Sequence, residues 1–254
     1  MTTTRIARIP YLNSAPFYRG LVLSGDIPQT DCVPRVLGAR AAAGEIAAGP
    51  LPLVEYFRLQ ETFERLGRFG IAVRGRARSA LLFSRKPIRQ LDGAVIAVTQ
   101  ESSTTACLLR LLLEVRYKIQ PAEYRRGASD DADALLLIGD EALRFQRTNT
   151  QYPFEIDVAF EWWLWQHLPF VFAVWAVRKD LDPGTKKTIE LSLAKSLAKN
   201  LNHLDEVAAE ASPGLAIPSA DLQAYLSSFI YRLSQPEEEG IARFKELVNE
   251  FNLL

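Results

Sequence analysis

A short strand that runs directly into a polar turn opens the chain and constrains its fold more than any other segment. Residues 5–16 read RIARIPYLNSAP, with apolar Ile6 and Ile9 before a stop at Pro10. Open α/β sheets place their ligand crevices at the carboxyl ends of strands, and the turn delivers Asn13 and Ser14 to such an end. The same Asn-Ser-x-Pro order is also ordinary turn sequence, so a binding role and a purely structural one both stay open for these residues.

The rest of the chain reads as two α/β units followed by helices. After a helix at 15–24, strands at 30–33 and 70–73 and a helix at 34–48 complete the first unit, with a further strand at 79–84. Beyond Pro87 the pattern restarts, with strands at 94–98, 132–138, 156–160 and 170–177, and helices at 106–115, 141–145 and 161–167. From Pro183 onward everything reads as helix, over 186–202, 204–211, 219–233 and 236–251.

This order predicts an α/β protein of two hinged lobes with a ligand cleft between them. The chain has to cross between the lobes twice, near 84–87 and near 173–177, before its helical tail can cover the first lobe. We therefore expect lobe 1 to comprise residues 1–86 plus 176–254 and lobe 2 to comprise residues 87–175.

A run of polar residues at the start of the helix at 106–115 is a second candidate site. Residues 99–105 read TQESSTT, and Ser or Thr before a helix is typical of an N-cap. The free N–H groups and the dipole of a helix start also favour a bound anion. Asp140, after the buried strand at 132–138, is either a polar ligand or a helix cap.

Composition excludes several classes of function. The 254 residues carry 30 basic and 30 acidic side chains with no long run of one sign, which argues against nucleic acid and membrane surfaces as partners. Cys32 and Cys107 lack a CxxC spacing and read as buried thiols. With His167 and His203 as the only histidines, no metal site or Ser-His-Asp system shows in the spacing. We expect a cytoplasmic protein, since neither a signal peptide nor a long apolar span is visible.

Six segments taken together resemble one protein family. They read YLNSAP (11–16), GEIAAGPLPLVEY (44–56), SALLFS (79–84), ESSTTACLLRLLL (101–113), LLIGDEAL (136–143) and LPFVFAVWAVR (168–178). Their order and wording are similar to those of the chorismate dehydratases of the futalosine route to menaquinone, which have a periplasmic-binding-protein type II-like fold. The resemblance covers residues 5–180 and is thin over the helical tail.

The resemblance implies a lyase that eliminates water from chorismate to give 3-[(1-carboxyvinyl)oxy]benzoate, without a metal or organic cofactor. It implies that Asn13 and Ser79 are catalytic. It also implies that Ser102, Thr104 and Thr105 contact the small-molecule dicarboxylate. Ser14, Ser103 and Asp140, which lie in or beside the same segments, are further candidate substrate-binding residues.

Three positions depart from the usual pattern of that family. Ala47 stands where a second acid is common, and Gly75-Arg76-Ala77-Arg78-Ser79 replaces a Gly-Pro-Val-x-Ser turn. Gln166-His167 replaces a Thr-Gly pair before LPFVFA. The Gln166-His167 change affects the expected details of substrate contact rather than the class of reaction.

The chemistry fits the residues that the chain offers. Loss of the ring hydroxyl and the neighbouring proton makes an aromatic ring, so the protein needs positioning and charge stabilisation more than a strong base. The expected sites carry neutral donors, with Arg76 and Arg78 as possible carboxylate clamps and no histidine base. We expect Asn13 and Ser79 to orient the substrate, whose own carboxylate can accept the proton.

Two other functions remain open at this point. A solute-binding protein without turnover shares the expected fold. The related enzyme that forms 1,4-dihydroxy-6-naphthoate is also similar, although its motifs fit YLNSAP and LPFVFAVW less well.

For the tryptophans at 162, 163, 165 and 175, packing in the core is the simpler role.

Overall fold

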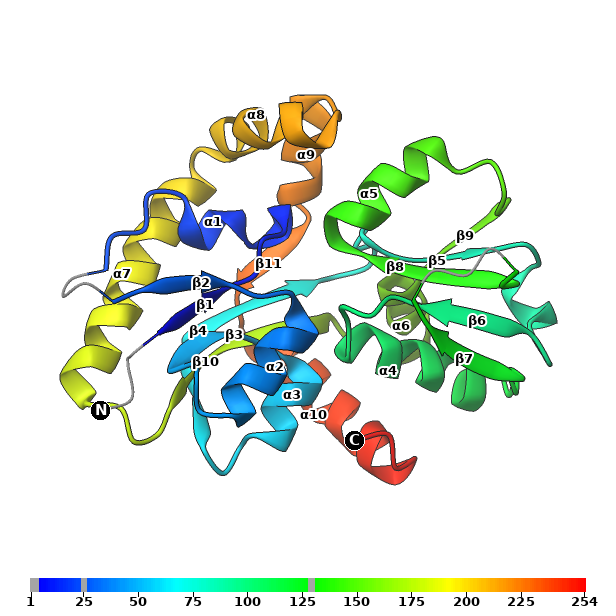
Figure 1. The fold of residues 1–254 in the computed structure, drawn as a ribbon, viewed down its shortest axis with the longest axis horizontal. Helices are drawn as coiled ribbons and strands as arrows, with labels where there is room; N and C mark the ends of the chain where they lie inside the picture. Colours follow the sequence, from blue (N-terminus) through cyan, green and yellow to red (C-terminus); the bar gives the residue numbers. More distant parts are fainter. Residues whose placement is uncertain (1–4, 24–26, 128–130) are drawn as a thin grey trace. The chain divides into compact units, whose positions relative to one another are not determined.

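The computed structural model describes residues 5–23, 27–127 and 131–254. The chain divides into two compact units, of which unit 1 comprises Met1–Ala72 and Val171–Ser234, and unit 2 comprises Val73–Phe170 and Gln235–Leu254. Each unit is built around its own β-sheet (Figure 1).

Unit 1 contains a six-stranded sheet in the order β11-β4-β10-β3-β1-β2. Strand β1 pairs in parallel with β2 and β3, whereas β10 runs antiparallel to β3. The strands are β1 (Ile6–Arg8), β2 (Gln29–Asp31), β3 (Ala48–Pro52), β4 (Phe63–Val73), β10 (Phe170–Arg178) and β11 (Phe229–Arg232).

The two faces of this sheet follow from the alternation of side chains along its strands. On one face Ala7, Leu51 and Ala176 pack with Leu37 and Ala41 of α2 (Pro34–Ala42). On the other face Trp175 contacts Phe17 of α1 (Ala15–Tyr18), with the ring centroids 5.6 Å apart. The helices of unit 1 also include α3 (Leu53–Arg58), α7 (Pro183–Leu201), α8 (Leu204–Leu215) and α9 (Ser219–Leu226).

Unit 2 contains a five-stranded sheet in the order β7-β6-β8-β5-β9. Strand β6 is parallel to β7 and β8, and β5 is antiparallel to β8 and β9. The strands are β5 (Ala80–Ser84), β6 (Val95–Val98), β7 (Glu123–Arg126), β8 (Ala134–Ile138) and β9 (Phe154–Asp157). Strands β5 and β8 are buried along their whole length, which explains their uninterrupted apolar sequences.

The helices of unit 2 are α4 (Thr104–Arg110), α5 (Gly139–Thr148), α6 (Val158–Gln166) and α10 (Gln235–Glu250). Of these, α5 and α6 pack on strands of the sheet. Helix α4 continues as a π-helix over Leu111–Arg116, a form that occurs mostly as single turns, frequently at functional sites. None of the helices in the described part of the chain is long and apolar enough to cross a bilayer.

A partly buried ion pair fixes the end of this π-helix to α6. Arg116 Nη1 lies 2.6 Å from Glu161 Oε2, and both side chains are 17% exposed. The Tyr117 hydroxyl donates to the same carboxylate at 2.5 Å. Burial, helped by this bond to Glu161, raises the pKa of Tyr117 to about 12. The phenol therefore stays neutral at ordinary pH.

Replacing Glu161 by Ala is expected to destabilise the fold by about 2–3 kcal/mol, because it leaves the Arg116 guanidinium partly buried and unpaired. Urea unfolding of the variant measures this loss. The control is Glu123→Ala, which removes an exposed partner of Arg125 and should leave the midpoint unchanged. Equal unfolding midpoints for both variants would contradict a stabilising role for the Arg116–Glu161 ion pair.

The division into units differs from the lobes expected from the sequence at three places. Segment 73–86 lies in unit 2 because β5 pairs with β8 and β9 there. Residues 171–175 lie in unit 1, where Ala173 pairs with Pro52 of β3. The last helix also lies in unit 2, because Phe244 packs against Trp162 and Phe170 with ring centroids 5.8 and 5.1 Å away.

Several expected elements have other bounds in the structure. The expectation of an all-helical tail is wrong at Phe229–Arg232, which forms strand β11, so the expected helix at 219–233 ends at Leu226. The first helix spans only Ala15–Tyr18, and the helix expected over 34–48 ends at Ala42. Strand β4 is eleven residues long and begins at Phe63, and β7 was not expected.

Candidate functional site

The turn after β1 brings Asn13 to the carboxyl end of that strand in unit 1. Residues Leu12–Ser14 form a single 3₁₀ turn, and α1 follows at once with Pro16 in its first turn. Proline is favoured there because its missing N–H would have no partner in any case. The chain therefore leaves the strand through a rigid turn, and Asn13 lies at its centre.

Asn13 carries the clearest sign of an unused binding group in unit 1. Its amide oxygen is buried and has no hydrogen-bond partner among the described residues. Such a group costs free energy in a folded protein, and an unsatisfied polar atom therefore indicates a site where a ligand can supply the missing partner. The amide can accept a hydrogen bond from a hydroxyl and donate one to a carboxylate.

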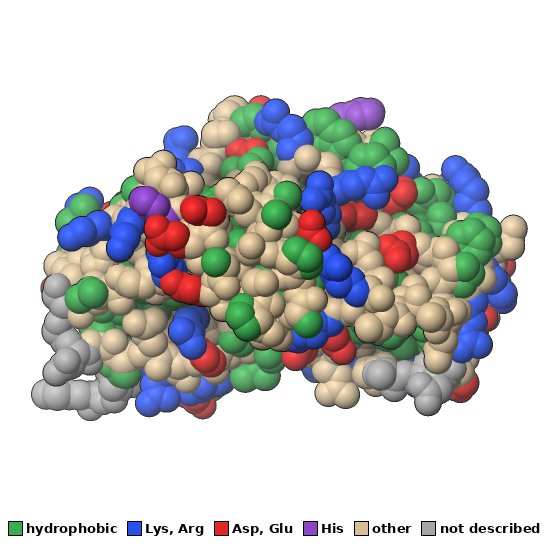
Figure 2. Space-filling view, turned by 90° about the horizontal axis from the view of Figure 1, so that it is seen from above, with side chains coloured by type: hydrophobic (Ala, Val, Ile, Leu, Met, Phe, Trp, Pro, Cys, Tyr) green, Lys and Arg blue, Asp and Glu red, His purple; other side chains and the backbone are tan. Residues whose placement is uncertain are grey.

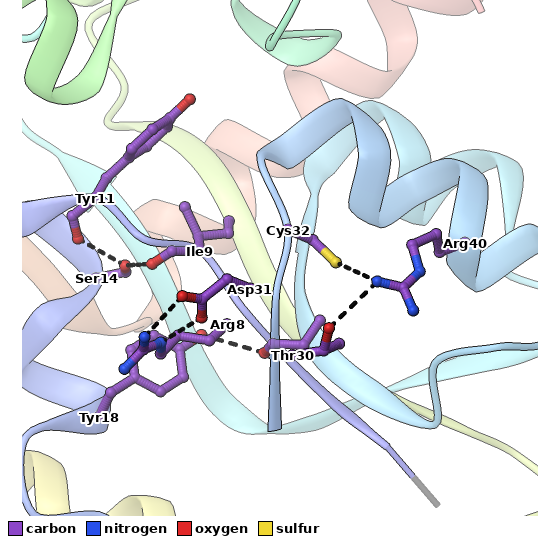
Figure 3. A network of polar contacts seen from close by, with 10 residues as sticks. Arg8, Ile9, Tyr11, Ser14, Tyr18, Thr30, Asp31, Cys32 and Arg40 are labelled. Carbon is purple, nitrogen blue, oxygen red and sulfur yellow. Dashed lines mark hydrogen bonds and ion pairs between the residues drawn. The ribbon is translucent and has the colours of Figure 1, made fainter. Parts of the chain in front are cut away.

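Ser14 makes its contacts within the turn itself (Figure 3). Its side chain is 0% exposed, and its hydroxyl lies 2.5 Å from the carbonyl oxygen of Ile9 and 2.8 Å from that of Tyr11. Since these carbonyls belong to the same turn, the hydroxyl closes the turn that presents Asn13. The structure thus gives Ser14 a contact within the turn, and Asn13 the open amide oxygen.

Charged groups near β1 are paired with one another (Figure 3). Arg8 donates to both carboxylate oxygens of Asp31 at 2.6 and 2.8 Å, and this pairing lowers the pKa of Asp31 and raises that of Arg8. Arg40 reaches Thr30 and Cys32, each at 3.3 Å. These contacts join β1, β2 and α2, so they stabilise the base of the turn.

In unit 2, three of the expected site segments meet at one edge of the sheet. The parallel strands β6 and β8 end there, and β5 begins there because it runs the other way, with Ala80 opposite Ile138. Two backbone bonds hold the edge together, from Gly139 N–H to the carbonyl of Ser79 at 2.8 Å and from Thr99 N–H to that of Leu136 at 3.0 Å. Ser79, the segment from Thr99 to Thr105 and Asp140 are therefore neighbours in the fold.

The start of α4 is capped by a hydroxyl, as the Ser/Thr run predicts. The Ser102 hydroxyl accepts a hydrogen bond from the Thr105 N–H at 3.0 Å. Ser102, Thr104 and Thr105 are 3–5% exposed. The hydroxyl oxygen of Ser103 is buried without a partner among the described residues. The helix start thus combines a satisfied Ser102 hydroxyl with one unpartnered hydroxyl, and the helix dipole favours an anion there.

The other two expected residues lie beside this helix start. Ser79 is 4% exposed and precedes β5. Asp140 is half-buried in the first turn of α5, where its charge suits the helix dipole, and the helix begins at Gly139 with a positive φ of 59°. Next to it, partial burial and the charge of Glu101 raise the pKa of Glu141.

Two residues of this edge were missed by the sequence reasoning. Asp157 ends β9 and caps α6 through the N–H groups of Ala159 and Phe160, both at 3.1 Å. Phe160 lies under the guanidinium of Arg76, with 4.2 Å between Cζ and the ring centroid. An Asp between a strand and a helix is a recognisable cap signal, but its contacts to residues 77–78 could not be read from the sequence.

Two of the four tryptophans have the core role that the sequence favours. Trp162 and Trp175 are 0% exposed and pack in the cores, whereas Trp163 and Trp165 are partly buried. Cys32 and Cys107 are buried and are not joined in a disulfide. The face of the molecule in Figure 2 carries interspersed acidic and basic side chains, in agreement with the zero net charge.

The chain is similar to known proteins over its whole length. A family model described as "Menaquinone biosynthesis" matches residues 4–250. The chain is 33% identical over 253 residues to the chorismate dehydratase of Thermus thermophilus, covering 93% of this chain and 92% of that protein.

Solved structures show the same fold at low sequence identity. Protein AF1704 from Archaeoglobus fulgidus matches with a TM-score of 0.80 and 16% identity, covering 98% of each chain. The alkanesulfonate-binding protein SsuA from Xanthomonas axonopodis pv. citri matches with a TM-score of 0.67 and 13% identity, covering 100% of this chain and 94% of that one. The fold is therefore of the periplasmic-binding-protein type, and the match over residues 4–250 shows that the chain belongs to the menaquinone biosynthesis family.

Proposed function

We propose that this protein is a chorismate dehydratase, a lyase that converts chorismate into 3-[(1-carboxyvinyl)oxy]benzoate in the futalosine route to menaquinone. The observation that carries the proposal is the 33% identity to a chorismate dehydratase over 93% of the chain. The open amide oxygen of Asn13, at the end of β1, supplies a polar group suited to the substrate hydroxyl.

The reaction breaks two bonds of the substrate ring. The C–O bond to the ring hydroxyl and a C–H bond on the neighbouring carbon break. The electron pair of the C–H bond forms the last double bond of the aromatic ring, and the pair of the C–O bond leaves with the hydroxyl. The hydroxyl and the proton leave together as water, so no oxidant, reductant or external group is consumed. Because aromatisation drives the step, correct placement of the substrate contributes more than a strong base.

Within this proposal, Asn13 orients the substrate and stabilises charge that develops as the hydroxyl leaves. Ser79, in unit 2, is the second proposed catalytic residue, and its carbonyl accepts a hydrogen bond from the Gly139 N–H. One carboxylate of the substrate accepts the proton and passes it to the leaving hydroxyl, so that the two depart as water. One well-aimed donor contributes about 3 kcal/mol to such a step.

We assign the binding of a substrate carboxylate to the start of α4. The unpartnered hydroxyl of Ser103 and the positive end of the helix dipole favour an anion. The Ser102 cap and the buried Thr104 and Thr105 keep this turn rigid. Asp140 contributes polarity to the edge, and Ser14 contributes by closing the Asn13 turn. The family is biosynthetic, which supports a cytoplasmic location.

A solute-binding protein without turnover is the second candidate, favoured by the fold that the chain shares with SsuA. Purified protein is incubated separately with chorismate and with cyclic dehypoxanthine futalosine, the substrate of the naphthoate-forming enzyme, while ultraviolet absorbance is followed. A chorismate dehydratase consumes only chorismate and forms an aromatic product. Binding of chorismate without a spectral change would favour the solute-binding function, and turnover of the second compound alone would favour the naphthoate-forming enzyme.

A further inference from the structure

We propose that Asp157 is a positioning residue that holds the loop carrying Ser79 in its working conformation. The proposal rests on the catalytic role suggested for Ser79 and extends it to a residue that the sequence did not single out. Asp157 lies in unit 2 at the end of β9, opposite Leu81 of β5. Its side chain is buried, with 5% of the residue exposed.

The two carboxylate oxygens of Asp157 serve two different segments. Oδ1 accepts from the N–H groups of Ala159 and Phe160, both at 3.1 Å, and so caps α6. Oδ2 accepts from the N–H of Arg78 at 2.7 Å, across 79 positions of sequence. A helix cap needs only one oxygen. The second oxygen therefore ties the 74–79 loop to the start of α6.

The loop needs such a tie because Arg78 has a left-handed backbone conformation, with φ of 61°. For a residue with a side chain this conformation costs on the order of 1 kcal/mol, and it persists only where surrounding contacts enforce it. The Arg78 N–H is the group that Asp157 binds, and Ser79 is the next residue. On its other side, Ser79 is fixed through its carbonyl by the Gly139 N–H at 2.8 Å.

The surroundings of Asp157 show that its carboxylate holds two backbone segments in place. Burial raises the pKa of Asp157, and backbone N–H groups of Arg78, Phe160, Ala77 and Ala159 oppose that rise. These N–H donors compensate for the desolvated charge, because hydrogen bonds to a charged acceptor are among the stronger ones. Four backbone donors from two segments converge on one side chain.

A second contact links the same loop to the same helix. The Arg76 guanidinium lies over the Phe160 ring at 4.2 Å from the centroid, a geometry typical of a cation–π interaction. Loop residues 76 and 78 thus both contact the start of α6, one through a side chain and one through the backbone. The two contacts fix the path of the chain into Ser79.

The test uses Asp157→Asn in the full-length protein. The Asn side chain keeps one oxygen for the α6 cap, but its NH₂ group cannot accept the Arg78 N–H. We expect kcat for chorismate to fall on the order of 10- to 100-fold, because a small misplacement of a reacting group has effects of that size. KM should change less than about threefold, since the anion-binding helix α4 is untouched.

The matched control is Asp182→Asn. Asp182 caps α7 in unit 1 by accepting from the Thr185 N–H at 2.8 Å, and its other contact, to the Thr185 hydroxyl, lies within the same turn. This variant should retain wild-type kcat. Should Asp157→Asn fail to fold, Asp157→Ser replaces it, because Ser also caps a helix through one oxygen.

Two further measurements separate positioning from a merely structural role. In a double-mutant cycle with Ser79→Ala, the Asp157→Asn effect on kcat should nearly vanish if Asp157 acts through Ser79. Hydrogen–deuterium exchange of residues 74–80 should be faster in Asp157→Asn than in wild type, and this readout does not depend on the substrate. Unchanged kcat, or additive effects in the cycle, would overturn the proposal.

If the proposed dehydratase function is wrong, the kinetic and exchange measurements give a different set of results. If the wild-type protein does not convert chorismate, the dehydratase assignment is lost while hydrogen exchange still tests whether Asp157 holds the loop. If wild type is active and Asp157→Asn equals it in both kcat and exchange, only the positioning proposal is lost.

Discussion

Replacing Asn13 by Ala is expected to lower kcat/KM for chorismate about 100- to 1,000-fold. Losing one preorganised group that stabilises developing charge has an effect of that size, about 3–4 kcal/mol. The amide oxygen of Asn13 is buried and has no partner among the described residues, so it can accept a hydrogen bond from the substrate, while the NH₂ group of the same amide is the donor for the developing negative charge. Steady-state kinetics with chorismate measure the change.

The same substitution should leave stability nearly unchanged. The Asn13 oxygen contributes no hydrogen bond in the described structure, and removing an unsatisfied buried polar atom can be neutral or slightly stabilising. Asn202→Ala is the matched control, because that exposed amide contacts only the carbonyl of Ala198 on its own helix. Turnover of Asn13→Ala within threefold of wild type would remove Asn13 from the mechanism.

Replacing Phe244 by Ala is expected to destabilise unit 2 by about 3–5 kcal/mol, the usual loss for truncating a buried aromatic side chain. Phe244 is 0% exposed and makes edge-to-face contacts with Trp162 and Phe170. These contacts attach α10 to the rest of unit 2. Thermal and urea unfolding, with peptide-resolved hydrogen exchange over 235–250, measure the loss.

Phe251→Ala is the control for this prediction. Phe251 follows the same helix but is 41% exposed, so its truncation should leave the unfolding midpoint unchanged. Near-identical midpoints for Phe244→Ala and wild type would show that α10 does not contribute to the core of unit 2, and would contradict the assignment of the last helix to that unit.

The buried strands could be predicted well from the sequence because their composition leaves little choice. FVFAVWAV and ADALLLI contain runs of apolar residues that suit strands covered on both faces, and they form β10 and β8. Strand β11 was missed because Phe229–Arg232 follows a helix directly and has too few residues to establish a strand period. Its pairing with β4 is a tertiary contact that local sequence does not contain.

The sequence predicts which segments form the candidate site, but it does not predict the contacts between residues far apart in the chain. The turn at Asn13 and the capped start of α4 follow from local signals, namely the strand that stops at Pro10 and the Ser/Thr run. The bond from Arg78 to Asp157 joins residues 79 positions apart. No local pattern indicates such a contact, and so the anchoring of the Ser79 loop became visible only in the structure.

The most direct measurement is the identity of the product that the purified wild-type protein forms from chorismate. Nuclear magnetic resonance and mass spectrometry of the reaction mixture should show chorismate replaced by 3-[(1-carboxyvinyl)oxy]benzoate, with loss of one water and with the enolpyruvyl group retained. Chorismate that is recovered intact after incubation with folded protein, or a product that has lost the enolpyruvyl group, would contradict the dehydratase function.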